Sequence, residues 1–285
     1  MNKLPLSAAG LGLRRGLVND LQNLADDDSR RPDFIEVTPE NWMNLGGRFA
    51  RDLNWFTQER YPVVSHGLSL NLGGPDKLDR AFIDRLGEFL DKHHVIHFSE
   101  HLSYCGDSGH LYDLIPMPFT EAAVEHVAER IQQVQKQLGR RIAVENVSAY
   151  TIPDGEMSEQ EFLLKVIEAA DCDLMFDVNN VYVNSFNHGY DPHDFIQALP
   201  TERIVYMHVA GHLQETYDLI IDTHGDAVID PVWDLLEFTY ACHGNKPTLL
   251  ERDFNLPPVD ELLDEVATIR RYQQQSQQPT KQAIA

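Results

Sequence analysis

Histidine, aspartate and glutamate residues follow several short apolar runs in this sequence, at positions where charged side chains are costly to bury. His66 follows the run PVVS, Glu145 follows IAV and Asp177 follows LMF. Imidazole nitrogens and carboxylate oxygens together form the mixed ligand sets that bind iron, zinc and manganese in proteins. Because a His, Asp or Glu closes seven of these runs, the pattern predicts a metal centre rather than isolated buried ion pairs.

The candidate ligands outnumber those of a single metal ion. They come from the ends of the runs and from the segment after the seventh run: His66, His101, Glu145, Asp177, Asn180, His208, Asp222, His224 and Glu251. A mononuclear site takes three or four protein ligands, so this set predicts two or three ions bridged by carboxylates. Pairing with Arg14 and Arg252 is the alternative, but two cations do not balance so many carboxylates, which would raise one another's pKa values.

Two asparagines and one cysteine accompany these candidates. Asn180 suits both direct ligation and a hydrogen bond that orients a ligand, whereas Asn146 better suits the orienting role. Cys105 has no partner cysteine in a CxxC pair, so we expect it to be a small buried apolar residue.

Three further residues are candidates for acid–base catalysis. We expect His188, placed in a long loop after the sixth strand, His212 and Glu100 to move protons, with the two histidines also available as additional ligands. Glu100 alternatively accepts hydrogen bonds from the backbone while its neighbour binds metal. Glu36 is expected to pair with Arg14.

Eight short apolar runs would have to place these side chains together. We predict strands at Leu11–Leu13, Phe34–Val37, Pro62–Ser65, Val95–Phe98, Ile142–Val144, Leu174–Phe176, Ile204–Met207 and Thr248–Leu250. Helical patterns lie between them, and no Pro/Gly/Ser-rich linker divides the chain. This alternation predicts a single (β/α)₈ TIM barrel, whose catalytic residues gather where the strands end. A doubly wound open sheet is the alternative, although no GxGxxG motif follows the first strand.

Helix signals support the alternation. Apolar residues recur with helical spacing over residues 79–93 and 120–138, and Ser158–Glu161 forms a capping box before an apolar run. Pro192 and Pro231 each follow an aspartate suited to N-capping. The closing helix is expected from about Pro258 to Arg271. We therefore predict one barrel domain over residues 1–272 and a disordered tail over residues 273–285.

Composition excludes several classes of protein. The 285 residues include 23 basic and 45 acidic ones, for a net charge of −22, and no basic cluster with interleaved aromatics is visible. Such a chain would repel a nucleic acid backbone. No apolar stretch is long enough to span a membrane, and the first residues lack the apolar core of a secretory signal. The three separated cysteines suit a reducing cytoplasm.

Nine strings of residues, in order along the chain, resemble those of a known enzyme family. They are PDFIEVTPENW, HGLSLNLGG, FSEHLSYCG, HLYDLIPMPFT, AVENVS, FDVNNVYVNSFNHG, HVAGH, IDTHGDAVIDPVWDL and LLERD. From about Leu11 to Val266 the sequence is similar to the multinuclear non-heme iron-dependent oxidative enzymes, which include the iron enzyme of methanobactin biosynthesis. The resemblance implies a xylose-isomerase-like barrel and points to the same positions as iron ligands, with Asn180 and His188 close behind.

The resemblance also implies a chemistry. Family members hold two or three irons in mixed Fe(II)/Fe(III) states and use O₂ to modify a cysteine in a ribosomally synthesised precursor peptide. Several work with a separate partner protein that presents the peptide. This chain shows no additional domain to grip a leader peptide, so a partner protein is expected.

Two other functions remain open from the residues. The ligand types equally suit a zinc- or manganese-dependent hydrolase or isomerase of the endonuclease-IV and xylose-isomerase barrel class. A non-enzymatic metal-binding or assembly protein would bind metal tightly without turnover. Metal identity and oxygen consumption distinguish these alternatives.

Overall fold

Eight parallel strands close into a barrel, as predicted. The structure is a computed structural model that describes residues 3–106, 109–151 and 155–276. Around the barrel the strands are β1 (Ala9–Gly12), β12 (Thr248–Leu250), β9 (Ile204–Val209), β8 (Asp173–Asp177), β7 (Ala143–Glu145), β4 (Phe98–His101), β3 (Val63–Gly67) and β2 (Phe34–Val37). Every neighbouring pair is parallel. The prediction of a single barrel is confirmed, and the alternative of an open sheet is wrong.

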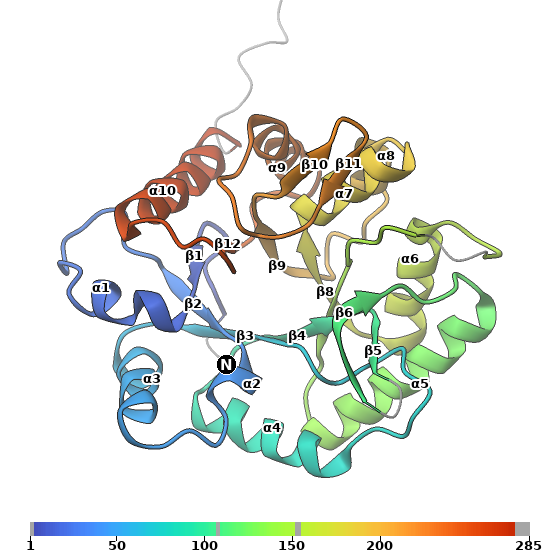
Figure 1. The fold of residues 1–285 in the computed structure, drawn as a ribbon, viewed down its shortest axis with the longest axis horizontal. Helices are drawn as coiled ribbons and strands as arrows, with labels where there is room; N and C mark the ends of the chain where they lie inside the picture. Colours follow the sequence, from blue (N-terminus) through green and yellow to red (C-terminus); the bar gives the residue numbers. More distant parts are fainter. Residues whose placement is uncertain (1–2, 107–108, 152–154, 277–285) are drawn as a thin grey trace, which may run out of the picture.

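Helices surround the strands, as Figure 1 shows looking into the barrel. They are the 3₁₀ turn η1 (Arg15–Leu17) and α1 (Val18–Gln22), α2 (Pro39–Trp42), α3 (Gly47–Glu59), α4 (Arg80–Lys92), α5 (Glu121–Leu138), α6 (Glu159–Ala170), α7 (Val178–His188), α8 (Pro192–Gln197), α9 (Asp230–His243) and α10 (Val259–Ser276). The predicted capping box opens α6, with the Ser158 side chain accepting from the Glu161 amide and the Glu161 side chain accepting from the Ser158 amide. Asp191 caps α8 as expected, whereas Asp230 is the first helical residue of α9 rather than its N-cap.

Two antiparallel hairpins were not predicted from the sequence. Strands β5 (Tyr104–Gly106) and β6 (His110–Ile115) form one after β4, and β10 (Leu213–Thr216) and β11 (Leu219–Ile221) form the other after β9. Both follow barrel strands, at the end where the candidate ligands gather.

Some element boundaries differ from the predicted ones. The fourth strand begins at Phe98 rather than Val95, because the Val95 amide still donates to the Leu90 carbonyl of the preceding helix. Helix α10 extends past Arg271 to Ser276, so residues 273–276 are helical rather than part of the predicted tail. The Gln273 side chain is buried and donates to the Ala8 and Lys246 carbonyls. The rest of that tail, residues 277–285, lies outside the described residues.

The barrel interior consists of two layers, because alternate residues of a strand point to the same side. The lower layer is a buried cluster that includes one residue from each of six strands: Phe34, Val64, Ala143, Met175, Tyr206 and Leu249. The upper layer holds the residue two positions later along the chain from each of these, which is in the strand for Glu36, His66, Glu145, Asp177 and His208 and directly after β12 for Glu251. Gly10 of β1 leaves room for the lower layer, since a Cβ there would lie 2.5 Å from the Phe34 ring.

The other side of each strand packs against the helices. Ile35, Val144 and Phe176 belong to the main hydrophobic core together with helix residues such as Leu86 and Ile131. This core is the large apolar shell between strands and helices, and it fixes the barrel that positions the upper layer.

Candidate metal centre

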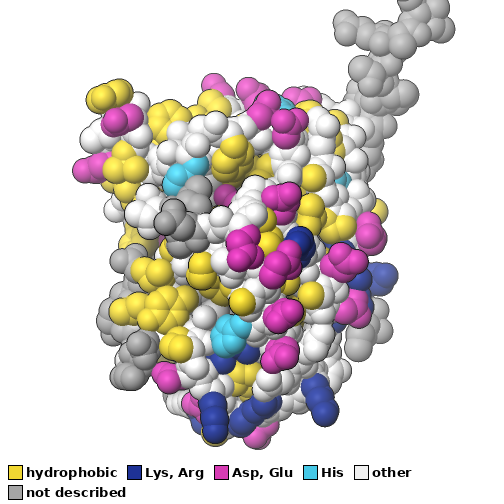
Figure 2. All heavy atoms as spheres, turned by 90° about the vertical axis from the view of Figure 1, so that its right-hand side faces the viewer, with side chains coloured by type: hydrophobic (Ala, Val, Ile, Leu, Met, Phe, Trp, Pro, Cys, Tyr) yellow, Lys and Arg dark blue, Asp and Glu magenta, His cyan; other side chains and the backbone are white. Residues whose placement is uncertain are grey.

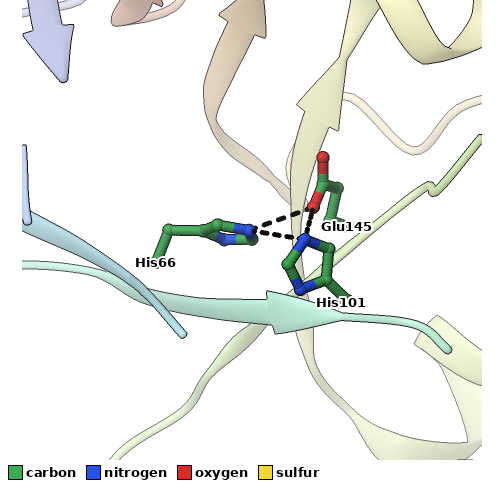
Figure 3. Close-up of side chains that lie close together, drawn as sticks. All are labelled: His66, His101 and Glu145. Atoms are coloured by element: carbon green, nitrogen blue, oxygen red, sulfur yellow. Dashed lines mark hydrogen bonds and ion pairs between the residues drawn. The ribbon is translucent and has the colours of Figure 1, made fainter. Parts of the chain in front are cut away.

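Three side chains from neighbouring strands converge at the mouth of the barrel. His66 of β3, His101 of β4 and Glu145 of β7 lie with their tips together (Figure 3). The Nε2 atoms of the two histidines are 3.1 Å apart, and the Glu145 Oε2 lies 3.2 Å from His66 Nε2 and 3.3 Å from His101 Nε2. Ligands at about 2.0–2.2 Å from a metal lie roughly 3.0–3.5 Å from one another, so this triangle fits one face of a coordination shell.

A second set of ligand candidates comes from the opposite arc of the barrel. His208 Nδ1 lies 2.8 Å from Glu251 Oε2 and 3.9 Å from Asp177 Oδ2. His224, in the loop after β11, places Nδ1 3.2 Å from Glu251 Oε2 and Nε2 3.9 Å from Asp177 Oδ2. The backbone of His224 has a φ of 48°, a left-handed conformation that costs a non-glycine residue about 1–3 kcal/mol and is typical of functional sites.

The two sets are joined by shared residues. Four groups of three side chains bring their ligand atoms within 4.8 Å: His66, His101 and Glu145; Glu145, Asp177 and His208; Glu36, His208 and Glu251; and Asp177, His224 and Glu251. Glu145, Asp177, His208 and Glu251 each belong to two groups. Sharing of carboxylates between adjacent groups is the arrangement that bridged metal ions require.

Unpaired polar atoms concentrate at this site. Ten buried side-chain nitrogen or oxygen atoms of the described residues make no hydrogen bond of normal geometry, and six of them belong to the mouth: His101 Nδ1, Glu145 Oε2, Asp177 Oδ2, Asn180 Oδ1, His208 Nδ1 and His224 Nε2. His208 Nδ1 and His224 Nε2 each lie 2.8 Å from a carboxylate oxygen, but these contacts are poorly directed for a hydrogen bond. Each unsatisfied buried group costs about 1–3 kcal/mol. A metal ion supplies the missing partner for such atoms, so the donor set fits the predicted metal centre.

The protonation states of the site conflict in the absence of metal. Burial raises the pKa of Glu145 and of Asp177 to about 7. Burial lowers the pKa of His66 to about 4, whereas Glu145 and Glu100 outweigh burial and raise the pKa of His101 to about 9. The pKa values of two neighbouring imidazoles, His66 and His101, are therefore shifted in opposite directions. Cations would resolve this conflict by favouring neutral imidazoles and ionised carboxylates together.

Asparagines after β7 and β8 hold the ligand candidates in place. The Asn180 Nδ2 donates to Glu145 Oε1 at 3.1 Å and to the Asn146 carbonyl at 3.0 Å. The Asn146 side chain exchanges two hydrogen bonds with the backbone of Asp177, both 2.9 Å long. Both asparagines thus make the orienting hydrogen bonds expected of them. The Asn180 Oδ1 remains buried without a partner and leaves its direct ligation a prediction.

Asp222 is more fully hydrogen-bonded than the other candidates. Its Oδ2 accepts from Ser148 Oγ at 2.8 Å, and its Oδ1 accepts from Asn179 Nδ2 at 3.0 Å. The same Oδ1 lies 2.8 Å from His224 Nε2. Asp222 lies outside the four groups of converging ligand atoms, so its role as a ligand also remains a prediction.

The three predicted acid–base residues occupy different positions. Glu100 is buried, accepts from the Ser69 and Leu70 amides, and lies 3.4 Å from His101 Nδ1. The His212 ring lies 2.7 Å from Asn179 Oδ1, behind Asp222. His188 is the last residue of α7 rather than part of a long loop, and its Nε2 bonds the Ala149 carbonyl at 2.6 Å. Of these three residues, Glu100 is the one whose described contacts include a member of the four metal-binding groups, namely His101.

The expected pair between Glu36 and Arg14 does not form among the described contacts. Glu36 instead contacts His208 and Tyr206, and Arg14 contacts Glu251 at 3.1 Å and also Asp253. The sequence analysis missed Ser99 and Tyr206, which lie two residues before His101 and His208. Residues two positions before a ligand on the same strand face the barrel interior as well, and this spacing could have identified both.

A cavity of about 610 Å³ opens above the site. Its walls include the ligand candidates His66, His101, Glu145 and Glu251. The apolar part of the lining comprises Leu68, Cys105, Leu111, Leu114 and Phe254, and of these Phe254 is 64% exposed. The cavity is therefore large enough, and apolar enough, to receive a side chain with adjoining backbone.

Eight parallel strands with His and carboxylate side chains at their ends define a xylose-isomerase-like TIM barrel with a candidate metal centre. The fold is similar to a D-psicose 3-epimerase from Clostridium cellulolyticum H10, with a TM-score of 0.59 and 13% identity over 94% of this chain and 96% of that one. It is equally similar to a xylose isomerase domain protein from Planctomyces limnophilus, with a TM-score of 0.61 and 12% identity over 94% and 99%. Such low identities show a shared fold alone.

Residues 8–274 match the RiPP precursor modification enzymes MbnB/TglH/ChrH, and the chain belongs to this family. RiPPs are ribosomally synthesised peptides that enzymes modify, so the chain is a member of a precursor-peptide modification enzyme family. UPF0276 protein Nmul_A2550 of Nitrosospira multiformis is 57% identical over 96% of both chains. UPF0276 protein PA3283 of Pseudomonas aeruginosa is 52% identical over 95% of this chain and 94% of its own. In the described residues, no helix has the length and apolar character needed to cross a membrane.

Proposed function

We propose that this protein is a multinuclear iron enzyme that uses O₂ to oxidise a cysteine residue of a ribosomally synthesised precursor peptide. The observation that carries the proposal is the chain of overlapping His and carboxylate groups at the mouth of the barrel, in a member of a peptide-modifying family. Two or three irons, in mixed Fe(II)/Fe(III) states, would be held by the nine predicted ligands. Iron bound there would supply a Lewis acid for a cysteine thiolate and electrons for reaction with O₂.

The residues of the cavity support a peptide substrate. Leu68, Leu111 and Phe254 expose apolar side chains beside the ligand candidates, where the residues flanking a cysteine would pack. Burial raises the pKa of the cavity residue Cys105 to about 11, and its Sγ lies 3.7 Å from the Leu68 carbonyl. We propose that the sulfur ligand at this site is the thiolate of the substrate cysteine rather than Cys105.

Proton transfer is assigned to the three predicted residues by their distance from the ligand candidates. Glu100 lies 3.4 Å from His101 Nδ1, and His101 lines the cavity. His212 acts through Asn179 on Asp222, and His188 through the loop that carries Ser148. We therefore propose Glu100 as the principal acid–base residue.

The distribution of charged side chains on the surface indicates which macromolecules the protein could bind. On the face over α5 and α6 in Figure 2, acidic side chains are spread among hydrophobic ones, and the basic side chains lie mainly near the lower edge. That face has no basic groove for a nucleic acid. We propose a separate protein that presents the peptide. We also place the reaction in the cytoplasm, where the three free cysteines would stay reduced.

The test is turnover of a cysteine-containing precursor peptide by anaerobically purified, iron-loaded protein. We expect a mass change of the peptide, located to a cysteine, that depends on O₂ and on any partner protein encoded beside the peptide. A peptide with that cysteine replaced by serine is the control and should stay unmodified. A loaded enzyme that modifies both peptides, or neither with the partner present, contradicts the proposal.

The second candidate is a zinc- or manganese-dependent hydrolase or isomerase. The observation that favours it is the fold shared with D-psicose 3-epimerase, together with ligand types that zinc accepts. It predicts activity with zinc or manganese in the absence of O₂.

A further inference from the structure

A line of buried hydrogen bonds crosses the barrel beneath the metal centre. Glu36 of β2, Ser99 of β4 and Tyr206 of β9 are each at most 1% exposed. Tyr206 donates its hydroxyl proton to Glu36 Oε2 at 2.8 Å, and its oxygen lies 2.6 Å from Ser99 Oγ. Neither β2 nor β4 neighbours β9 in the barrel, so the line passes through the interior rather than along the sheet.

Each end of this line reaches the far ring nitrogen of a ligand candidate. Ser99 Oγ lies 2.7 Å from His66 Nδ1, and Glu36 Oε2 lies 2.9 Å from His208 Nε2. The opposite nitrogens, His66 Nε2 and His208 Nδ1, are those that converge with Glu145, Asp177 and Glu251. The line therefore contacts two histidines that belong to different candidate metal-binding groups.

The direction of every hydrogen bond follows from counting protons. A hydroxyl group has one proton to donate. Tyr206 uses its proton on Glu36, so Ser99 must donate to Tyr206. Ser99 then has no proton left for His66 and must accept, which requires the proton of His66 to be on Nδ1. Glu36 Oε2 accepts from Tyr206 and also lies 2.9 Å from His208 Nε2, and its acceptance of a second hydrogen bond there requires a proton on His208 Nε2.

We propose that Glu36 is a positioning residue whose carboxylate orients both His66 and His208, the first of them through the buried hydroxyls of Tyr206 and Ser99. The result is a pair of opposite orientations: His66 presents Nε2 to the metal centre, and His208 presents Nδ1. The Glu36 carboxylate would thus fix the ring orientation of a histidine in each of two metal-binding groups. The proposal depends on the metal-binding part of the proposed function, but its first readout uses metal-free protein.

The experiment is nitrogen-15 NMR of histidine side chains in metal-free protein, with His66 assigned through a His66→Asn variant. At neutral pH His66 is expected to be neutral and to carry its proton on Nδ1. Tyr206→Phe and Ser99→Ala should each shift the proton of His66 toward Nε2, although Tyr206 has no described hydrogen bond to His66. Tyr206→Phe should leave the hydrogen bond between Glu36 and His208 intact.

Matched controls separate positioning from packing. Tyr240→Phe removes another buried tyrosine hydroxyl, bonded to Thr248, and Ser65→Ala removes another buried serine hydroxyl, bonded to the Val37 carbonyl. Neither should change the His66 signal. Tyr206→Phe and Ser99→Ala should weaken metal binding by about 10- to 100-fold, the usual effect of losing a hydrogen bond behind a ligand.

Each outcome has a distinct meaning. A wild-type His66 protonated on Nε2, or a His66 signal unchanged by Tyr206→Phe, overturns the proposal. Loss of one bound ion in Glu36→Gln without any change at His66 makes Glu36 a ligand and also overturns it. If the predicted His66 tautomers appear but the protein binds no metal, the hydrogen-bonded line stands and the proposed function fails.

Discussion

The two layers of the barrel interior are equally buried but differ in how their polar atoms are satisfied. Phe34, Met175 and Leu249 of the lower layer are inaccessible to solvent, and Asp177 and His208 of the upper layer are equally so. In the lower layer the Tyr206 hydroxyl has two hydrogen-bond partners. In the upper layer, Glu145, Asp177 and His208 each retain a buried atom that makes no hydrogen bond of normal geometry. Solvent exposure therefore does not distinguish the two layers. They differ in whether their buried polar atoms have well-formed hydrogen bonds.

Along one strand, a residue that stabilises the barrel and a candidate metal ligand are therefore only two positions apart. Apolar residues two positions before the ligands fill the barrel, while the ligands themselves destabilise the metal-free fold. Substitutions should then have opposite signatures. Changes of the apolar residues in the lower layer should reduce stability and leave metal binding intact, whereas changes of the upper layer, or of the Tyr206 hydroxyl that hydrogen-bonds to Glu36, should weaken metal binding and leave the fold intact.

The largest effect is expected in the upper layer. Asp177→Asn keeps a side-chain oxygen that can accept the Asn180 amide hydrogen bond at the start of α7 but removes the charge shared by two metal-binding groups. We expect turnover to fall by at least about a thousandfold and bound iron to be lost, with circular dichroism unchanged. A variant that retains full metal content and activity would remove the distinction between the layers.

The counterpart in the lower layer is Phe34→Ala. Removal of this buried ring should lower the free energy of unfolding by about 3–5 kcal/mol in denaturant titrations. The number of metal ions per folded chain should not change, because no ligand atom is removed. Loss of metal at full stability would show that the Phe34 ring is itself part of the site.

Metal should stabilise the protein, and more so at higher pH. The pKa values of Glu145 and Asp177, raised to about 7, lie above their ordinary values of 4.5 and 3.8, so the folded state binds more protons than the unfolded state between those limits. The contribution of these two carboxylates to the stability of the metal-free protein therefore falls as pH rises to about 7, and His101, with a pKa of about 9, extends the fall. His66, with a pKa lowered from 6.5 to about 4, contributes in the opposite direction between those two values.

Metal binding requires the ionised carboxylates, so Fe(II) added anaerobically should raise the melting temperature more at pH 8 than at pH 6. At a free concentration 100 times the Kd, one site contributes about 2.7 kcal/mol. Thermal melts at both pH values measure the effect, and a stabilisation that is larger at pH 6 contradicts it.

A smaller effect is expected from the asparagines of α7. Asn180→Ala removes the hydrogen bond to Glu145 and should weaken metal binding by about 10- to 100-fold in a chelator competition. Asn187→Ala on the same helix removes hydrogen bonds to Ile220 instead and is the matched control. Equal losses in both variants would indicate a defect of the helix rather than of ligand orientation.

Much of the site was predictable because its signal is local. A charged residue directly after an apolar run, as in Asp177 after LMF, is costly to bury unless a partner exists. Seven of the eight apolar runs end in a His, Asp or Glu, and the barrel that the eight runs predict brings these ends together. The groups formed by His66, Glu145, His208 and Glu251 follow from this pattern and the barrel topology.

The remainder depends on contacts across the barrel that no local pattern encodes. Glu36 bonds His208 and Tyr206 rather than Arg14, because the positions of opposite strand ends decide which groups meet. Likewise, α7 starts directly after β8, so Asp177 both caps a helix and faces the metal centre. That junction makes His188 a helical residue and not a loop residue.

The most direct measurement of the central claim is the metal content of anaerobically purified protein by elemental analysis, with Mössbauer spectroscopy of an iron-57-enriched sample. We expect two or three irons per chain, partly ferrous and magnetically coupled, because the candidate metal-binding groups share Glu145, Asp177 and Glu251. Stoichiometric zinc or manganese with little iron after iron-replete expression, or a folded protein that binds no metal, would contradict it.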